Sequence, residues 1–232
     1  MFEFLKAGGF LILPILICSI IALAIVIERF FALKARNIVP ENVISKAHKL
    51  AASGNIPSKK DIQNIRNSSL VGKVLAAGLE SSQSPRHIMK ENLEETGRHV
   101  AHEMDRYMTA LGTIAAVTPL LGLLGTVVGM IEVFSVITKM GVGSPTDLAG
   151  GISTALITTA AGISVAVPAL IFHRYFKAKT NNYVVRMEQE ALKLVELASD
   201  KHRIPAAMKT ATTKQPTKRR AVKSTASTRG SA

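Results

Sequence analysis

Three long stretches of the chain contain no charged side chain, and each is long enough to form a membrane-spanning helix. They run from Ala7 to Ile27, from Tyr107 to Ile131 and from Leu148 to Phe172. A helix needs about 20 residues to cross a hydrocarbon core about 30 Å thick. Because the apolar residues are bunched in these stretches rather than spread at regular spacing, the sequence predicts an all-α membrane protein with three transmembrane helices.

The charged residues predict how these spans are oriented. The segment 34–106 has twelve Lys and Arg against eight acidic residues, and the tail from Lys177 onward has thirteen against four. Residues 1–10 hold one Lys and one Glu, and residues 139–151 hold one Lys and one Asp. Since basic loops stay cytoplasmic, we expect the N-terminus and the second connection outside, and the 34–106 region and the tail inside.

The first apolar stretch has an alternative interpretation as a cleaved signal peptide, because Ala-Leu-Ala at 22–24 has the form of a cleavage site. Two observations argue against it. The leading residues have no net positive charge, and the apolar run continues past this site to Glu28 and Arg29. We therefore expect an uncleaved helix from Phe2 to Lys34.

Helical spacing of apolar residues continues from the second and third spans into the cytoplasm. Residues Pro85–Met140 are predicted to form one helix roughly 80 Å long. The third helix is predicted to end at Pro205, and shorter helices are expected at roughly 40–52 and 59–81. The predicted divisions are 1–36 (N-terminal segment and first transmembrane helix), 37–106 (cytoplasmic helices), 107–138 (second transmembrane helix), 139–149 (short outer connection), 150–174 (third transmembrane helix), 175–204 (cytoplasmic extension) and 205–232 (basic disordered tail).

Small residues follow helical spacing in the second and third spans. In lipid, small residues let two helix backbones approach closely, so the simplest interpretation is helix packing. This interpretation is assigned to Gly125 and Gly129. The second span also contains Gly122, and the third has a stripe made of Ala155, Thr159, Gly162, Ala166 and Ala169.

Two threonines add a polar function to these faces. Thr126 follows Gly122 by one turn, and Thr159 follows Ala155 by one turn, so that a hydroxyl from each helix can face one shared space. We therefore predict that Thr126, Thr159, Gly122, Ala155 and Gly162 line an ion pathway or lumen.

The spans contain no Asp, Glu or His at mid-membrane depth, although proton relays across membranes usually depend on such residues. Glu28, Arg29, Glu132 and Arg174 stand at the ends of the uncharged stretches and are interpreted as interfacial anchors. For Glu132, an interaction with the translocated ion is the alternative interpretation. If the protein moves protons, a partner must therefore provide the titrating carboxylate.

Several other classes of function lack support in the sequence. It has no phosphate-binding loop, no Cys/His metal cluster and no nucleophile elbow, so we expect no enzymatic activity, metal or cofactor. The basic tail lacks interleaved aromatic residues, which argues against nucleic acid. Contact of the tail with anionic membrane lipid is the favoured interpretation.

The segments Gly122–Gly129 and Gly151–Gly162, with Pro168 downstream, resemble the ExbB/TolQ/MotA family of ion-driven stator subunits. The end of the first span, Ile27–Phe30, is also similar to ExbB members. Members of the MotA type have four spans, so three spans favour ExbB or TolQ. The resemblance covers roughly residues 1–200.

The resemblance implies a pentamer in a bacterial inner membrane, whose second and third helices line a central lumen. Single-span ExbD-like or TolR-like partners would occupy the lumen and bring the proton-carrying aspartate. A TonB-like or TolA-like protein would carry the work to the outer membrane. The lumen-facing threonines of the family map onto Thr126 and Thr159, and Thr154 stands where many members have a glutamate.

The leading hypothesis is therefore a proton-driven energy transducer of the ExbB type that serves TonB-dependent uptake. A TolQ-type subunit for envelope maintenance uses the same physics and is the nearest alternative. A passive channel or scaffold, in which the threonines only pack, belongs to a different class. Protons are favoured over sodium because no cluster of acidic or carbonyl ligands is visible in the spans.

Overall fold

The computed structural model describes residues 10–53, 56–141 and 145–211, and the part of the first predicted helix before Phe10 lies outside them. The described residues are almost entirely helical and contain no strand, which confirms the predicted all-α class. Side chains are described for these ranges except at 140, 145, 147 and 200–211. The helices are α2 (Ile12–Ala32), α3 (Ala35–Ile38), α4 (Glu41–Ser53), α5 (Lys59–Ser68), α6 (Leu70–Glu80), α7 (Arg86–Met104), α8 (Met108–Met140) and α9 (Pro145–Ala211).

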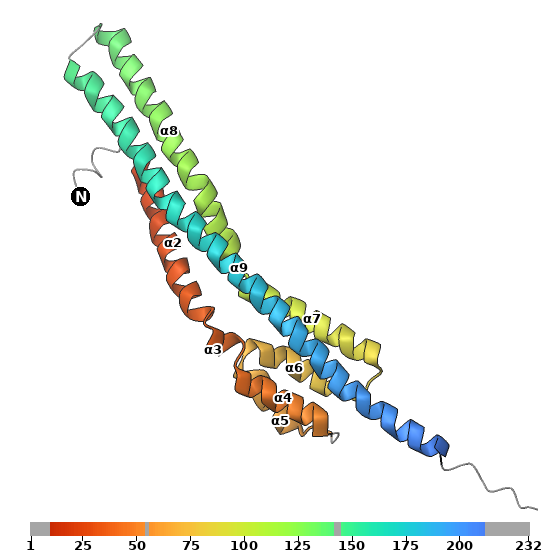
Figure 1. Ribbon diagram of the computed structural model, residues 1–232. Coiled ribbons are helices and arrows are strands. Elements are labelled where there is room, and N and C mark those ends of the chain that lie inside the picture. The colour runs from red at the N-terminus through yellow and green to blue at the C-terminus, as the bar shows by residue number, and fades with distance from the viewer. Residues whose placement is uncertain (1–9, 54–55, 142–144, 212–232) are drawn as a thin grey trace, which may run out of the picture.

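The molecule is elongated, and α9 runs along nearly its whole length (Figure 1). At one end α9 lies beside α8 and α2, and at the other end α4, α6 and α7 pack against it, while α5 packs against α6. Helices α2, α8 and α9 each contain a segment long and apolar enough to cross a membrane. The chain is therefore a multi-pass membrane protein with a membrane part (α2, α8 and the first half of α9). The remainder (α3 to α7 and the second half of α9) is called the cytoplasmic part after its predicted side of the membrane.

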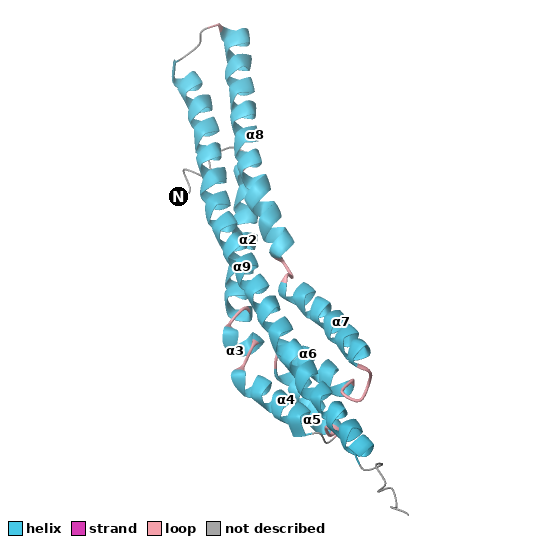
Figure 2. Cartoon of the chain, turned by 45° about the vertical axis from the view of Figure 1, so that its right-hand side comes forward, coloured by secondary structure: helices cyan, strands magenta, loops and turns pink. Residues whose placement is uncertain are grey.

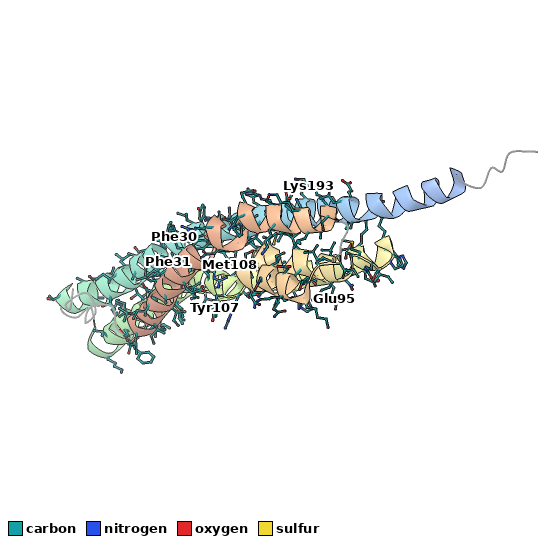
Figure 3. The ribbon with its side chains drawn as sticks, turned by 90° about the horizontal axis from the view of Figure 1, so that it is seen from below. Phe30, Phe31, Glu95, Tyr107, Met108 and Lys193 are labelled. Atoms are coloured by element: carbon teal, nitrogen blue, oxygen red, sulfur yellow. The ribbon has the colours of Figure 1, made fainter. Side chains whose placement is uncertain are left out.

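The predicted continuous helix Pro85–Met140 is wrong, because the chain breaks at an elbow formed by Asp105–Tyr107 (Figure 2). Tyr107 has a φ of 63°, the left-handed region that a bulky side chain rarely adopts. Apolar spacing misses this break because Met104 and Met108, on either side of it, are both buried. Figure 3 shows Tyr107 at the level along the molecule where α2 ends with Phe30 and Phe31.

Two smaller boundaries also differ from the predictions. The pattern at 59–81 forms two helices, because Ser69 is extended and its hydroxyl accepts a hydrogen bond from the Gly72 amide at 3.1 Å, which starts α6. Pro205 does not end the third helix, since α9 continues to Ala211. A proline removes only one backbone donor, so a helix can pass through it at an energetic cost.

The cytoplasmic part is held by large apolar side chains. Helix α9 contributes Phe176 and Leu194, which are completely buried. They belong to a single buried cluster with residues from α2, α4, α6 and α7. The Tyr183 hydroxyl also donates to the Leu33 carbonyl oxygen at 3.2 Å and ties α9 to the end of α2. This packing fixes the direction in which α9 enters the membrane part.

Candidate functional site

Helices α8 and α9 approach each other through glycine in the membrane part. A Cβ added to Gly162 would lie 2.8 Å from the Thr118 carbonyl oxygen and 3.1 Å from the Gly122 Cα. One added to Gly125 would collide with the Thr158 side chain. Since backbone atoms cannot move aside easily, only glycine allows these helices to pack at this distance.

A hydrogen bond joins the two helices near the middle of this contact. The Thr159 hydroxyl donates to the Gly122 carbonyl oxygen at 2.9 Å. Gly112 lies beside His173, which directly follows the third uncharged stretch. Ten residues separate Gly112 from Gly122, so the Thr159 bond lies about 15 Å farther along the span, which is mid-membrane depth.

The structure divides the predicted pathway residues into two groups. Thr126 and Thr159 are partly exposed, and the Thr126 hydroxyl donates to the Leu123 carbonyl oxygen of its own helix at 2.6 Å. In contrast, Gly122, Ala155 and Gly162 are buried between α8 and α9 of the same chain. These three positions have the packing geometry predicted for Gly125 and Gly129. A lumen lined by Thr126 and Thr159 stays a prediction.

Two residues of the contact were missed from the sequence. Thr118 and Thr158 are essentially fully buried between the helices. The Thr118 hydroxyl donates to the Ile114 carbonyl oxygen at 2.5 Å, and the Thr158 hydroxyl donates to the Thr154 carbonyl oxygen at 2.8 Å. Their spacing was informative, because Thr118 precedes Gly122 by one turn and therefore lies on the same stripe.

The outward faces of both helices are apolar. In the isolated chain, both helices expose large apolar side chains along their length, as expected for surfaces covered by lipid or by another protein. On α8 they include Leu120, Leu123, Val127 and Ile131, and on α9 they include Leu156, Ile163, Val167 and Ile171.

Arg29 is not a simple interfacial anchor, because its side chain is buried. Its Nε and Nη2 atoms donate to the Glu28 carboxylate at 2.5 and 2.7 Å, and Nη1 donates to the Met104 carbonyl oxygen at 3.0 Å. The guanidinium also lies over the Tyr107 ring, 5.5 Å from its centroid. Arg29 of α2 therefore binds the carbonyl that ends α7 and fixes the elbow.

The remaining predicted interfacial residues are exposed at opposite ends of the membrane part. Arg174 follows His173 at the C-terminal end of the third uncharged stretch. Glu132 lies toward the C-terminal end of α8, where it borders a cavity. The residues that the structure describes contain no group of His, Cys, Asp and Glu side chains suited to a metal ion.

Comparison with known proteins identifies the family. The profile of the MotA/TolQ/ExbB proton channel family matches residues 66–189, which include the whole contact between Gly122 and Thr159. This is a family of proton channel and transport subunits rather than a class of enzymes.

Individual relatives agree with this match. A Synechocystis sp. protein named ExbB-like 1 is 36% identical over 175 residues, which cover 74% of this chain and 68% of the relative. The biopolymer transport protein exbB1 of Vibrio cholerae is 31% identical over 70% of this chain and 72% of its own length. The biopolymer transport protein ExbB of Salmonella typhimurium is 30% identical over 54% of this chain and 51% of its own length. The chain therefore belongs to the MotA/TolQ/ExbB proton channel family, as an ExbB-like member.

Proposed function

We propose that this chain forms the ring of a proton-driven motor of the ExbB type in a bacterial inner membrane. Five copies surround a lumen that holds the transmembrane helices of an ExbD-like partner. Proton flow past the partner's aspartate moves this partner, and a TonB-like protein carries the work to receptors in the outer membrane. The ExbB names of the relatives favour this assignment over a TolQ-type role.

The observation that carries the proposal is the pair of threonines at mid-membrane depth on otherwise apolar faces. Thr126 and Thr159 stay partly exposed although α8 and α9 are tightly packed around them. The uncharged stretches that contain them provide no carboxylate. A hydroxyl can pass or orient a proton, but it is a poor proton store at neutral pH. A partner carboxylate beside the threonines would complete the pathway.

The experiment replaces each hydroxyl by a methyl group of similar size. Thr126→Val and Thr159→Val are expressed with the partner in cells that lack their own ExbB-type subunit, and uptake of an iron–siderophore complex is measured at equal protein levels. We expect about a tenfold loss of uptake, as for the loss of a functional polar group inside a membrane. Thr113→Val is the matched control, because its exposed hydroxyl bonds only the Thr109 carbonyl of α8.

The outcomes separate the competing functions. Normal uptake in both Thr126→Val and Thr159→Val cells would show that the threonines only pack, as in a passive scaffold. Leakage of periplasmic enzymes with normal uptake would instead assign the chain to a TolQ-type role. A loss of uptake in Thr113→Val cells that equals the other two would remove the link to the lumen.

A further inference from the structure

A cavity of about 240 Å³ lies between α8, α9 and the two residues before α2, Phe10 and Leu11. Gly125 and Gly129 of α8 form part of its wall. Its polar lining residues are Glu132 from α8 and Thr154 and Thr158 from α9. Two helices thus bring residues with a carboxylate and hydroxyls to the border of one cavity.

The carboxylate in this cavity is not neutralised by the helices around it. Glu132 is the only acidic residue of α8, and Lys139 lies about two turns farther out. The facing stretches 10–27 and 148–172 contain no charged residue. Among the side chains that the structure describes, Glu132 has no hydrogen-bond or ion-pair partner. A carboxylate in such surroundings favours a cation as its counterpart.

The hydroxyl of Thr154 is also suited to bind a cation. Its hydrogen atom is donated to the Gly150 carbonyl oxygen at 3.0 Å. What its oxygen offers to the cavity is therefore a lone pair, which accepts a hydrogen bond from a hydronium ion or binds a metal cation. The cavity thus presents acceptors of both kinds, a carboxylate and a hydroxyl oxygen.

The depth of the cavity connects it to the mid-membrane threonines. Glu132 is twenty residues beyond Gly112, or about 30 Å along α8, which places it at the outer edge of the hydrocarbon core. Thr158 lies one turn inward from Thr154 and is adjacent in sequence to Thr159, whose hydroxyl reaches Gly122. The lining therefore leads from the outer surface toward the Thr159 bond.

We propose that Glu132 is the outer loading site for the cation that drives the motor. Its carboxylate takes a proton from a hydronium ion and releases water, and it then gives the proton to a water molecule or partner carboxylate farther inward. The site rests on the proposed function, because it assumes that a cation moves inward along α8 and α9. It assigns this chain a titrating carboxylate of its own, in addition to the partner's aspartate.

The decisive experiment moves the carboxylate across the cavity. The complex with its partner is placed in lipid vesicles, and proton influx driven by an imposed voltage is measured with a pH-sensitive dye. E132Q is expected to lower influx about tenfold or more, as for the loss of a functional intramembrane carboxylate. The double variant E132Q/T154E, with the carboxylate on α9 facing the same space, is expected to restore at least half of it.

A matched control separates the cavity from the charge alone. E132Q/S153E places the carboxylate on the neighbouring residue, which is exposed and does not line the cavity. It is expected to leave influx as low as in E132Q. Equal rescue by both double variants, or normal influx in E132Q, would overturn the proposal. Repeating the measurement with a sodium-sensitive dye shows whether sodium is carried, and sodium influx that depends on Glu132 without proton influx would overturn the proton step.

A second measurement distinguishes failure of the site from failure of the proposed function. Dicyclohexylcarbodiimide modifies protonated carboxyl groups in apolar surroundings, and mass spectrometry locates the modified residue in the wild-type complex. We expect modification of Glu132 that increases as the pH falls, with the exposed Glu103 unmodified. Modification of Glu132 without any voltage-driven influx would support the loading site at Glu132 and contradict the proposed motor. Influx without modification, together with normal influx in E132Q, would support the motor and contradict the loading site.

Discussion

Helix α9 packs against other helices in two regions, and the side chains at the two contacts differ in size. Small residues form the contact in the membrane part, and large apolar side chains form the contact in the cytoplasmic part. In the membrane part it meets α8 through Gly162, Thr158 and Thr159. In the cytoplasmic part it buries Phe176 and Leu194. Water makes the burial of large apolar groups favourable, whereas lipid does not, so helices in lipid gain stability from close backbone contact and interhelical hydrogen bonds.

The surfaces of the two parts follow the same division. The membrane part exposes Leu156 and Ile171, while the cytoplasmic part exposes charged pairs such as Lys73–Glu103 and Arg186–Glu41. Between them lies the elbow, where the buried Arg29 side chain donates to the Met104 carbonyl oxygen at the end of α7. The comparison therefore predicts that each part responds to a different kind of substitution.

The largest effect is expected from the cytoplasmic core. Leu194→Ala removes a fully buried side chain and is expected to lower the free energy of unfolding by about 2–5 kcal/mol. Leu192→Ala is the matched control, because Leu192 is 53% exposed on the same helix. Denaturant unfolding of the purified chain in detergent measures both. An equal loss at Leu192 would show that the exposed face of α9 is covered by another copy.

The next effect is expected at the elbow. Arg29→Met keeps a long side chain but removes the bonds to Glu28 and Met104, and a hydrogen bond that involves a charged group contributes about 1.5–3 kcal/mol. We expect this loss in unfolding free energy, accompanied by faster proteolysis between α7 and α8. Unchanged proteolysis would mean that Tyr107 and the surrounding packing hold the elbow without Arg29.

In the membrane part, a substitution that adds volume between α8 and α9 is expected to lower the stability of the chain. Gly162→Ala places a methyl group 2.8 Å from the Thr118 carbonyl oxygen, and overpacking of this kind costs about 1–3 kcal/mol. Gly97→Ala in α7 is the control, since no atom lies within 4 Å of the added group. There the better helix propensity of alanine is expected to stabilise the chain by up to about 1 kcal/mol. Opposite signs in thermal unfolding would confirm the division, and equal signs would break it.

The sequence carried enough information for the spans and the small-residue stripes, because bunched apolar residues and three-and-four spacing are local signals. The elbow lay beyond such signals, since the apolar spacing continues through Met104 and Met108 while Tyr107 turns the backbone. Arg29 was misjudged for the same reason, because its carbonyl partner is 75 residues away. The spacing of Gly122 and Gly162 fits residues that line a lumen as well as residues that pack between helices. Only the position of the neighbouring helix distinguishes the two roles.

The smallest effect is expected from the charges of the cytoplasmic surface. The Lys73 ammonium lies 2.7 Å from the Glu103 carboxylate, but both side chains are largely exposed, and such pairs contribute about 0.2–1 kcal/mol. Lys73→Met should therefore change the unfolding free energy by less than about 1 kcal/mol. Added salt should remove even that difference. A loss comparable to that of Leu194→Ala would contradict the view that apolar burial holds this part, because water competes for an exposed ion pair but not for a buried leucine.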